Sequence, residues 1–204
     1  MKIAIIGTGN VGGALARGLS KKHEVFIGVR NQDTFKGKES LPLERLQVTS
    51  IEAAVQKAET VILATPAVAA IEVARSLGDT GSKVIIDTMN VVMKRGPEGF
   101  TNTADAILAH TKSQDIVKCF NTTGANNIAN PQYPSAAIDA FVAGNSIRGK
   151  AVAKELALDM GFADCIDVGG NDKFELMEHF ANFWINLAMF QGLGREIGFK
   201  ILKR

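Results

Sequence analysis

Short apolar runs rich in β-branched residues alternate along the chain with longer stretches whose apolar residues recur every three or four positions. The short runs predict strands and the longer stretches predict helices. The predicted strands are 2–6, 24–29, 45–48, 60–64, 83–87 and 116–120, with helices at 10–21, 50–57 and 67–77. Continuously apolar strands are typical of a parallel sheet covered on both faces. The alternation therefore predicts a doubly wound α/β fold.

The alternation becomes less regular after residue 120, where a strand at 140–143, a helix at 148–160 and a strand at 165–168 precede a long helix at 172–191. We expect residues 1–120 to form the main domain. Residues 121–204 are expected to form a small C-terminal α/β extension packed on it, for substrate binding or dimerisation. The last helix is apolar around most of its circumference, so it needs two partners. The sheet and a second copy of the chain would supply them, which predicts a homodimer.

The first predicted strand runs directly into Gly7-Thr8-Gly9-Asn10-Val11-Gly12. This G-x-G-x-x-G spacing is weak evidence alone, but here it joins a strand to a helix, and a second strand completes the unit within about 30 residues. Gly7 would permit the tight turn, Gly9 the approach of a pyrophosphate, and Gly12 close packing of helix and strand. The amides of residues 8–11 would then point at the phosphates. The motif predicts a Rossmann dinucleotide site; a turn of this kind without a ligand is the alternative.

The end of the second strand indicates which dinucleotide binds. An NAD site usually has an acidic residue about 20 residues after the glycines, but this strand closes with Val29-Arg30-Asn31. Arg30 can pair with a 2′-phosphate, and Asn31 and Thr34 offer further hydrogen bonds. Asp33 would weaken the preference, and a solvent-facing arginine is the alternative. The sequence favours NADP(H) over NAD(H).

Small polar residues follow three other predicted strands, in the segments Ala64-Thr65-Pro66, Asp87-Thr88-Met89-Asn90 and Phe120-Asn121-Thr122-Thr123-Gly124. Ligands of open α/β sheets bind at the carboxyl ends of the strands. Together these segments would surround a nicotinamide, although ordinary loop chemistry explains each one singly.

Composition excludes several other functions. The net charge of +2 comes from 23 basic and 21 acidic residues spread along the chain, so neither a nucleic acid nor a membrane surface is an expected partner. Cys119 and Cys165 lie in apolar runs and predict buried, reduced thiols. No spacing of cysteine and histidine predicts a metal site, and the first residues do not form a signal peptide. A cytoplasmic protein is expected.

The sequence contains motifs that are similar to those of a known family. The chain resembles the NADPH-dependent F-420 reductases, also called F-420-dependent NADP oxidoreductases, and more distantly the oxidoreductase domain of the STEAP metalloreductases. Besides the glycine loop, the resemblance rests on segments spread over nearly the whole chain: Gly28-Val29-Arg30, Lys94-Arg95-Gly96, Gly99-Phe100, Lys118-Cys119-Phe120-Asn121-Thr122, Asn186-Leu187, Gly192-Leu193-Gly194 and Glu196-Ile197-Gly198-Phe199-Lys200.

The resemblance implies that NADP(H) exchanges a hydride with a deazaflavin in one cleft. It implies pyrophosphate binding by residues 8–11 and 2′-phosphate binding by Val29, Arg30 and Thr34. Ala67, Ile71, Asn90 and Ala125 would lie along the ribose and nicotinamide, with Asn121 nearby. Val29 replaces the family's serine or threonine before the arginine, which removes one phosphate donor.

Hydride transfer between two stacked rings needs distance and alignment rather than a general base, so no catalytic side chain is predicted. We therefore expect an NADP(H)-dependent oxidoreductase with coenzyme F-420 or a flavin as co-substrate. A small NADPH-dependent imine or carbonyl reductase is a second hypothesis. A non-catalytic NADPH sensor is the third.

Overall fold

The computed structural model describes all 204 residues, and one eight-stranded sheet forms its centre, in the order β3-β2-β1-β4-β5-β6-β7-β8. The strands are β1 (Lys2–Ile6), β2 (Glu24–Val29), β3 (Leu46–Ser50), β4 (Thr60–Leu63), β5 (Val84–Asp87), β6 (Asp115–Cys119), β7 (Ala140–Ala143) and β8 (Cys165–Gly169). The helices are α1 (Asn10–Leu19), α2 (Ile51–Lys57), α3 (Ala70–Ser76), α4 (Thr103–His110), α5 (Ala125–Ala129), α6 (Ile147–Asp159) and α7 (Phe174–Ile185). None of these helices has the length and apolar character that crossing a membrane requires.

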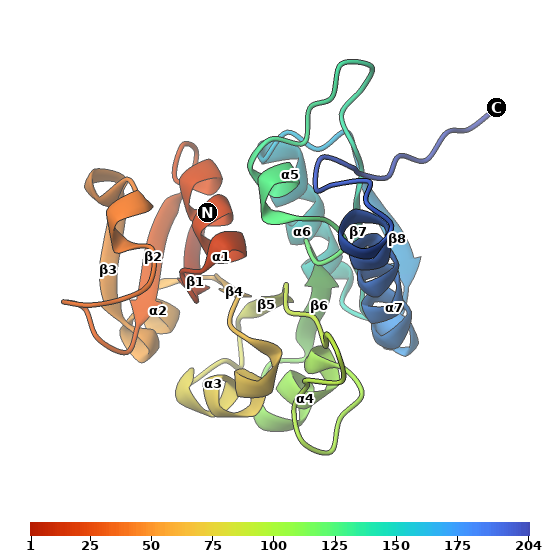
Figure 1. Ribbon diagram of the computed structural model, residues 1–204. Helices are drawn as coiled ribbons and strands as arrows, with labels where there is room; N and C mark the ends of the chain where they lie inside the picture. The colour runs from red at the N-terminus through yellow and green to blue at the C-terminus, as the bar shows by residue number, and fades with distance from the viewer.

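The strand order places β1 between β2 and β4, and all pairings from β3 across to β6 are parallel (Figure 1). The chain winds outward from β1 in one direction to β3 and in the other to β6. A crevice opens where the winding reverses, beside the carboxyl ends of β1 and β4. The predicted Rossmann α/β fold is confirmed, and the glycine loop lies at this switch point.

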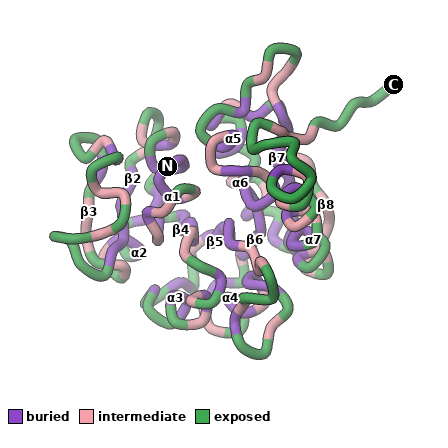
Figure 2. The backbone as a smooth tube through the Cα atoms, in the orientation of Figure 1, coloured by how far each residue is buried: buried purple, intermediate pink, exposed green.

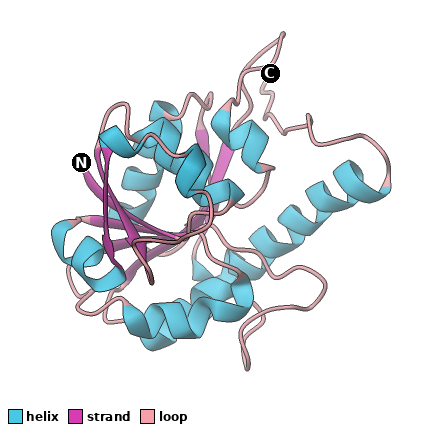
Figure 3. Ribbon diagram, turned by 60° about the vertical axis from the view of Figure 1, so that its left-hand side comes forward, coloured by secondary structure: helices cyan, strands magenta, loops and turns pink.

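Alternate residues of the strands belong to two large cores, because successive side chains of a strand point to opposite faces, and a third cluster of five buried residues includes Phe174 and Met177 of α7. Ile3 and Ile5 of β1 belong to a cluster of 27 buried residues shared with α1, α5 and α6. Ala4 and Ile6 belong to a cluster of 16 shared with α2, α3 and α4. Helices therefore cover both faces of the sheet (Figure 3), and burial is concentrated on the strands and on the inner sides of the helices (Figure 2).

The last two strands differ from the parallel sheet that the sequence predicts. β7 pairs antiparallel with β6, opposing Lys118 to Ala143, and β8 runs parallel to β7. An apolar run of four residues predicts a buried strand but carries no information on its direction. The sheet is therefore mixed, although mostly parallel, and it continues unbroken from the predicted main domain into the predicted C-terminal extension.

Several helices also differ from prediction. α4 and α5 were not expected, since each is too short to show a clear period. α4 is defined instead by a cap, because the side chain of Asn102 accepts a hydrogen bond of 2.8 Å from the amide of Asp105. The long helix expected at 172–191 is α-helical only to Ile185 and continues as a single π turn, Asn186–Phe190. Gly192, with φ of 74°, then ends it.

Candidate functional site

The three glycines of the loop after β1 have different environments. Gly7 has φ of 101°, and a Cβ there would lie 2.5 Å from the carbonyl oxygen of Ala64. A Cβ on Gly12 would overlap the carbonyl oxygen of Gly7. Gly9 has an ordinary φ of −69°, and a Cβ there would meet nothing within 4 Å. The fold itself therefore requires Gly7 and Gly12, whereas Gly9 leaves open space for a ligand.

A cavity of about 800 Å³ opens beside this loop and extends along the carboxyl ends of β1, β2 and β4. Most of the predicted cofactor-binding residues line it: Gly7, Thr8, Gly9, Asn10, Val11, Val29, Arg30, Asn31, Thr34, Ala64, Thr65 and Pro66. Residues from three strand ends, up to about 60 positions apart in the sequence, thus come together around one space. Their contact with a cofactor stays a prediction.

The remaining predicted residues do not line this cavity. Gly12 is buried under the loop, Ala67 is buried, and Ile71 is half-buried on α3. Ala125 lines a neighbouring groove that also has Asn10 in its wall. Asn90 and Asn121 form a pair of their own at the ends of β5 and β6, described below.

Two basic side chains, Arg30 and Lys36, line the cavity and are available to a 2′-phosphate. The Arg30 side chain is 85% exposed, and its Nη1 lies 3.8 Å from Oε1 of Glu72. An ion pair so exposed contributes little to stability, so Arg30 can exchange this partner for a phosphate. Lys36 and Phe35 also line the cavity. Lys36 and Glu72 were not predicted from the sequence, where the basic residues in the loop after β2 were the available signal.

At the other end of the site, the Asn90 and Asn121 side chains hold each other. Asn90 Nδ2 donates to the Asn121 carbonyl at 2.7 Å, and Asn121 Nδ2 donates to Asn90 Oδ1 at 2.9 Å and to the Met177 carbonyl at 3.1 Å. Phe120, buried with φ of 59°, turns the chain into this arrangement at the end of β6. Asn121 Oδ1 is buried without any donor. A buried acceptor is costly when unpaired.

A buried ionic cluster stabilises the chain segment that carries Asn90. Lys118 is fully buried, and its Nζ contacts Asp87 Oδ2 at 2.7 Å, Glu178 Oε1 at 2.9 Å and Thr103 Oγ1 at 2.9 Å. The two carboxylates also accept hydrogen bonds from the amides of Met89 and Val91. The cluster therefore fixes the segment that carries Asn90. It was missed from the sequence, where the signal was a lysine inside an apolar strand, in register with Asp87 of the next strand.

A Rossmann sheet with an open glycine loop and a cavity at its switch point is typical of dinucleotide-binding proteins. Residues 2–91 match the family model described as NADP oxidoreductase, coenzyme F420-dependent. This part of the chain is therefore similar to NADP-binding oxidoreductases, in agreement with the resemblance.

Solved structures share this fold over nearly the whole chain. A protein of Arthrobacter sp. FB24, designated a candidate F420-dependent NADP-reductase, has a TM-score of 0.85 and 26% identity, with 100% of both chains covered. A hypothetical protein of Sinorhizobium meliloti has a TM-score of 0.73 and 22% identity over 100% of this chain and 96% of its own. A reductive aminase of Aspergillus terreus, solved with NADPH and ethyl levulinate, has a TM-score of 0.67 and 18% identity over 94% of this chain but 62% of its own. The last two share the fold alone.

Proposed function

We propose that this oxidoreductase transfers a hydride between NADP(H) and a deazaflavin or flavin-type coenzyme, with F420 as the foremost acceptor. The observation that carries the proposal is the cavity that joins the open glycine loop to Arg30 and Lys36. The family model that residues 2–91 match and the designation of the Arthrobacter protein support F420 as the second coenzyme.

NADP(H), when bound, supplies the hydride. The chain's own part is binding and orientation. The amides of Thr8 to Val11 hold the diphosphate at the start of α1, while Arg30, Lys36 and the side chains of Asn31 and Thr34 read the 2′-phosphate. By the resemblance, Asn90 and Asn121 would lie near the nicotinamide. No group in this set needs to act as a general base, since the reaction depends on alignment.

A turnover panel tests the proposal. Purified protein is assayed with NADPH against F420, FMN, FAD, ferric chelates and cyclic imines, following nucleotide absorbance. We expect turnover with F420 or a flavin. Turnover with cyclic imines alone would instead support the imine-reductase hypothesis. Tight NADPH binding without any turnover would indicate a sensor. The fold likeness to the reductive aminase does not decide between these, since that chain is longer and only 18% identical.

Arg30→Ala is expected to weaken NADPH binding by about tenfold or more and to leave NADH binding nearly unchanged, because the lost contact reaches only the 2′-phosphate. Isothermal titration with both nucleotides measures this. Glu72→Gln is the matched control: it removes the carboxylate beside Arg30 and should leave NADPH binding equal or tighter. Equal losses for NADPH and NADH in Arg30→Ala would contradict the assignment.

We also propose that the chain dimerises through its C-terminal helix, within the predicted lobe of residues 121–204. Large apolar side chains in and after α7 are half or more exposed: Phe183, Met189, Phe190 and Leu193. Exposed apolar groups gathered in this way are typical of protein interfaces. Light scattering after size exclusion should report a dimer, and Phe190→Asp should shift it to monomer. Ile147→Asp, at an isolated exposed position on α6, should not; a monomeric parent protein would refute the proposal.

A further inference from the structure

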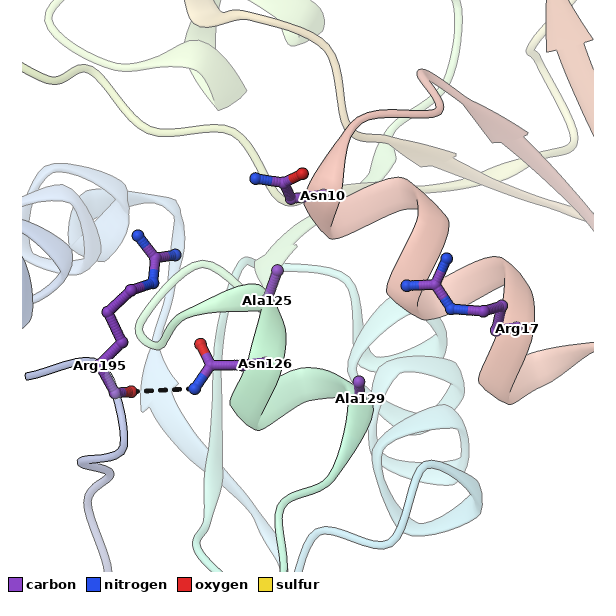
Figure 4. Close-up of a pocket in the computed structure, with 6 residues that line it drawn as sticks. All are labelled: Asn10, Arg17, Ala125, Asn126, Ala129 and Arg195. Atoms are coloured by element: carbon purple, nitrogen blue, oxygen red, sulfur yellow. Dashed lines mark hydrogen bonds between the residues drawn. The ribbon is translucent and has the colours of Figure 1, made fainter. Parts of the chain in front are cut away.

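A second groove, of about 330 Å³, lies between α1, α5 and the C-terminal segment. It is lined by Asn10, Arg17, Ala125, Asn126, Ala129 and Arg195. Asn10 also lines the dinucleotide cavity, so the two spaces adjoin at the glycine loop. In Figure 4, Arg195 and Arg17 flank α5 from opposite sides, with the small side chains of Ala125 and Ala129 between them.

The groove carries two arginines that form no ion pair, and one carboxylate lies beside it, since Glu196 Oε1 accepts from Asn126 Nδ2 at 2.7 Å. Among the arginines of the chain, only Arg30 and Arg148 form ion pairs with carboxylates, and neither lines this groove. Arg17 makes one long hydrogen bond, of 3.4 Å, to the carbonyl of Ser40, and Arg195 forms no ion pair. Both side chains belong to exposed residues, and guanidinium groups bind phosphates and carboxylates in a bidentate manner.

The position of Arg195 is fixed although it belongs to an irregular segment. Its carbonyl accepts from Asn126 Nδ2 at 3.1 Å and from Asn127 Nδ2 at 3.0 Å. Asn127 is itself buried, and its Oδ1 accepts from the Tyr133 hydroxyl at 2.9 Å. Burial, and then the charge of Glu196, raise the pKa of Tyr133, so this hydroxyl keeps its proton and remains a donor. The backbone at Arg195 is therefore held in place beside the groove.

NADP(H) does not account for these charges. Its 2′-phosphate is assigned to Arg30 and Lys36 and its diphosphate to the amides of the glycine loop, all on the other side of Asn10. We propose that the groove binds the acidic side chain of the second coenzyme, a flavin-type molecule whose phosphate or carboxylates contact Arg17 and Arg195. This inference rests on the proposed function and adds that the acceptor must be an anion.

Two matched pairs of acceptors test this: FMN with riboflavin, which differ in one phosphate, and F420 with the same deazaflavin lacking its acidic side chain. Binding is measured by fluorescence titration of the protein saturated with NADP⁺, and separately from turnover. We expect at least one acidic member to bind about tenfold or more tighter than its neutral partner. Arg17→Ala and Arg195→Ala should each remove most of that difference and leave the neutral partner and NADPH unchanged. Added salt should reduce the difference.

Arg45→Ala is the control variant, since Arg45 is exposed and lines neither cavity; it should preserve the preference. An acidic member that binds no better than its neutral partner would overturn the inference, as would absence of binding by both pairs or an equal loss of NADPH affinity in the groove variants. If the protein binds the acidic acceptors more tightly than the neutral ones but shows no turnover, only the proposed reaction is contradicted.

Discussion

Lys118→Met is expected to lower the free energy of unfolding by about 3–5 kcal/mol, because it removes the cation from a buried pair and leaves the carboxylates behind. Lys118 is fully buried between Asp87 and Glu178, which are buried as well. Two anions would then face each other in the interior without a counter-charge. Urea denaturation followed by circular dichroism measures the loss as a lower midpoint.

Glu178→Gln is the matched variant for this prediction. The substitution keeps the ion pair of Lys118 with Asp87 and leaves the cluster with no net charge. It removes the hydrogen bond that Glu178 Oε2 accepts from the Val91 amide at 2.7 Å. A loss of about 1–3 kcal/mol is expected, as for one buried hydrogen bond. If Lys118→Met costs no more than Glu178→Gln, the cluster does not stabilise the fold as an ionic unit.

The residues that the sequence could place are those governed by local rules. Gly7 needs a left-handed φ and Gly12 needs contact with backbone, and both requirements belong to one short turn whose flanking strand and helix are visible as patterns. Ser50 follows the same logic, since its side chain accepts from the Ala53 amide and begins α2 where the sequence predicts a helix. Neighbours along the chain determine these features.

Features that depend on pairing between distant segments could not be predicted in this way. The antiparallel direction of β7 depends on how the chain between β6 and β7 returns. The contact of Lys118 with Glu178 joins residues 60 positions apart, and nothing in the local pattern near Arg195 indicates that Asn126 and Asn127 hold it. Lys36 was missed for a related reason, because its place beside the cavity follows from the path of an irregular loop.

Gly9→Ala is expected to weaken NADPH binding by about a hundredfold or more while the protein stays folded, since the methyl group would occupy the space through which a pyrophosphate approaches the backbone. The structure separates the two effects. Gly9 has φ of −69°, which alanine adopts freely, and its added Cβ would meet no atom within 4 Å. Isothermal titration gives the affinity, and the thermal midpoint should stay within about 2 °C of the parent value.

Gly12→Ala is the contrasting variant. Its Cβ would overlap the carbonyl oxygen of Gly7, so stability and NADPH binding should fall together. The difference between these two glycines separates a loop shaped for a ligand from one shaped only for the fold. If Gly9→Ala binds NADPH as tightly as the parent protein, the amides of Thr8 to Val11 do not hold the diphosphate. The hydride-transfer proposal would then lose the geometry on which it depends, while the Rossmann fold would stand unchanged.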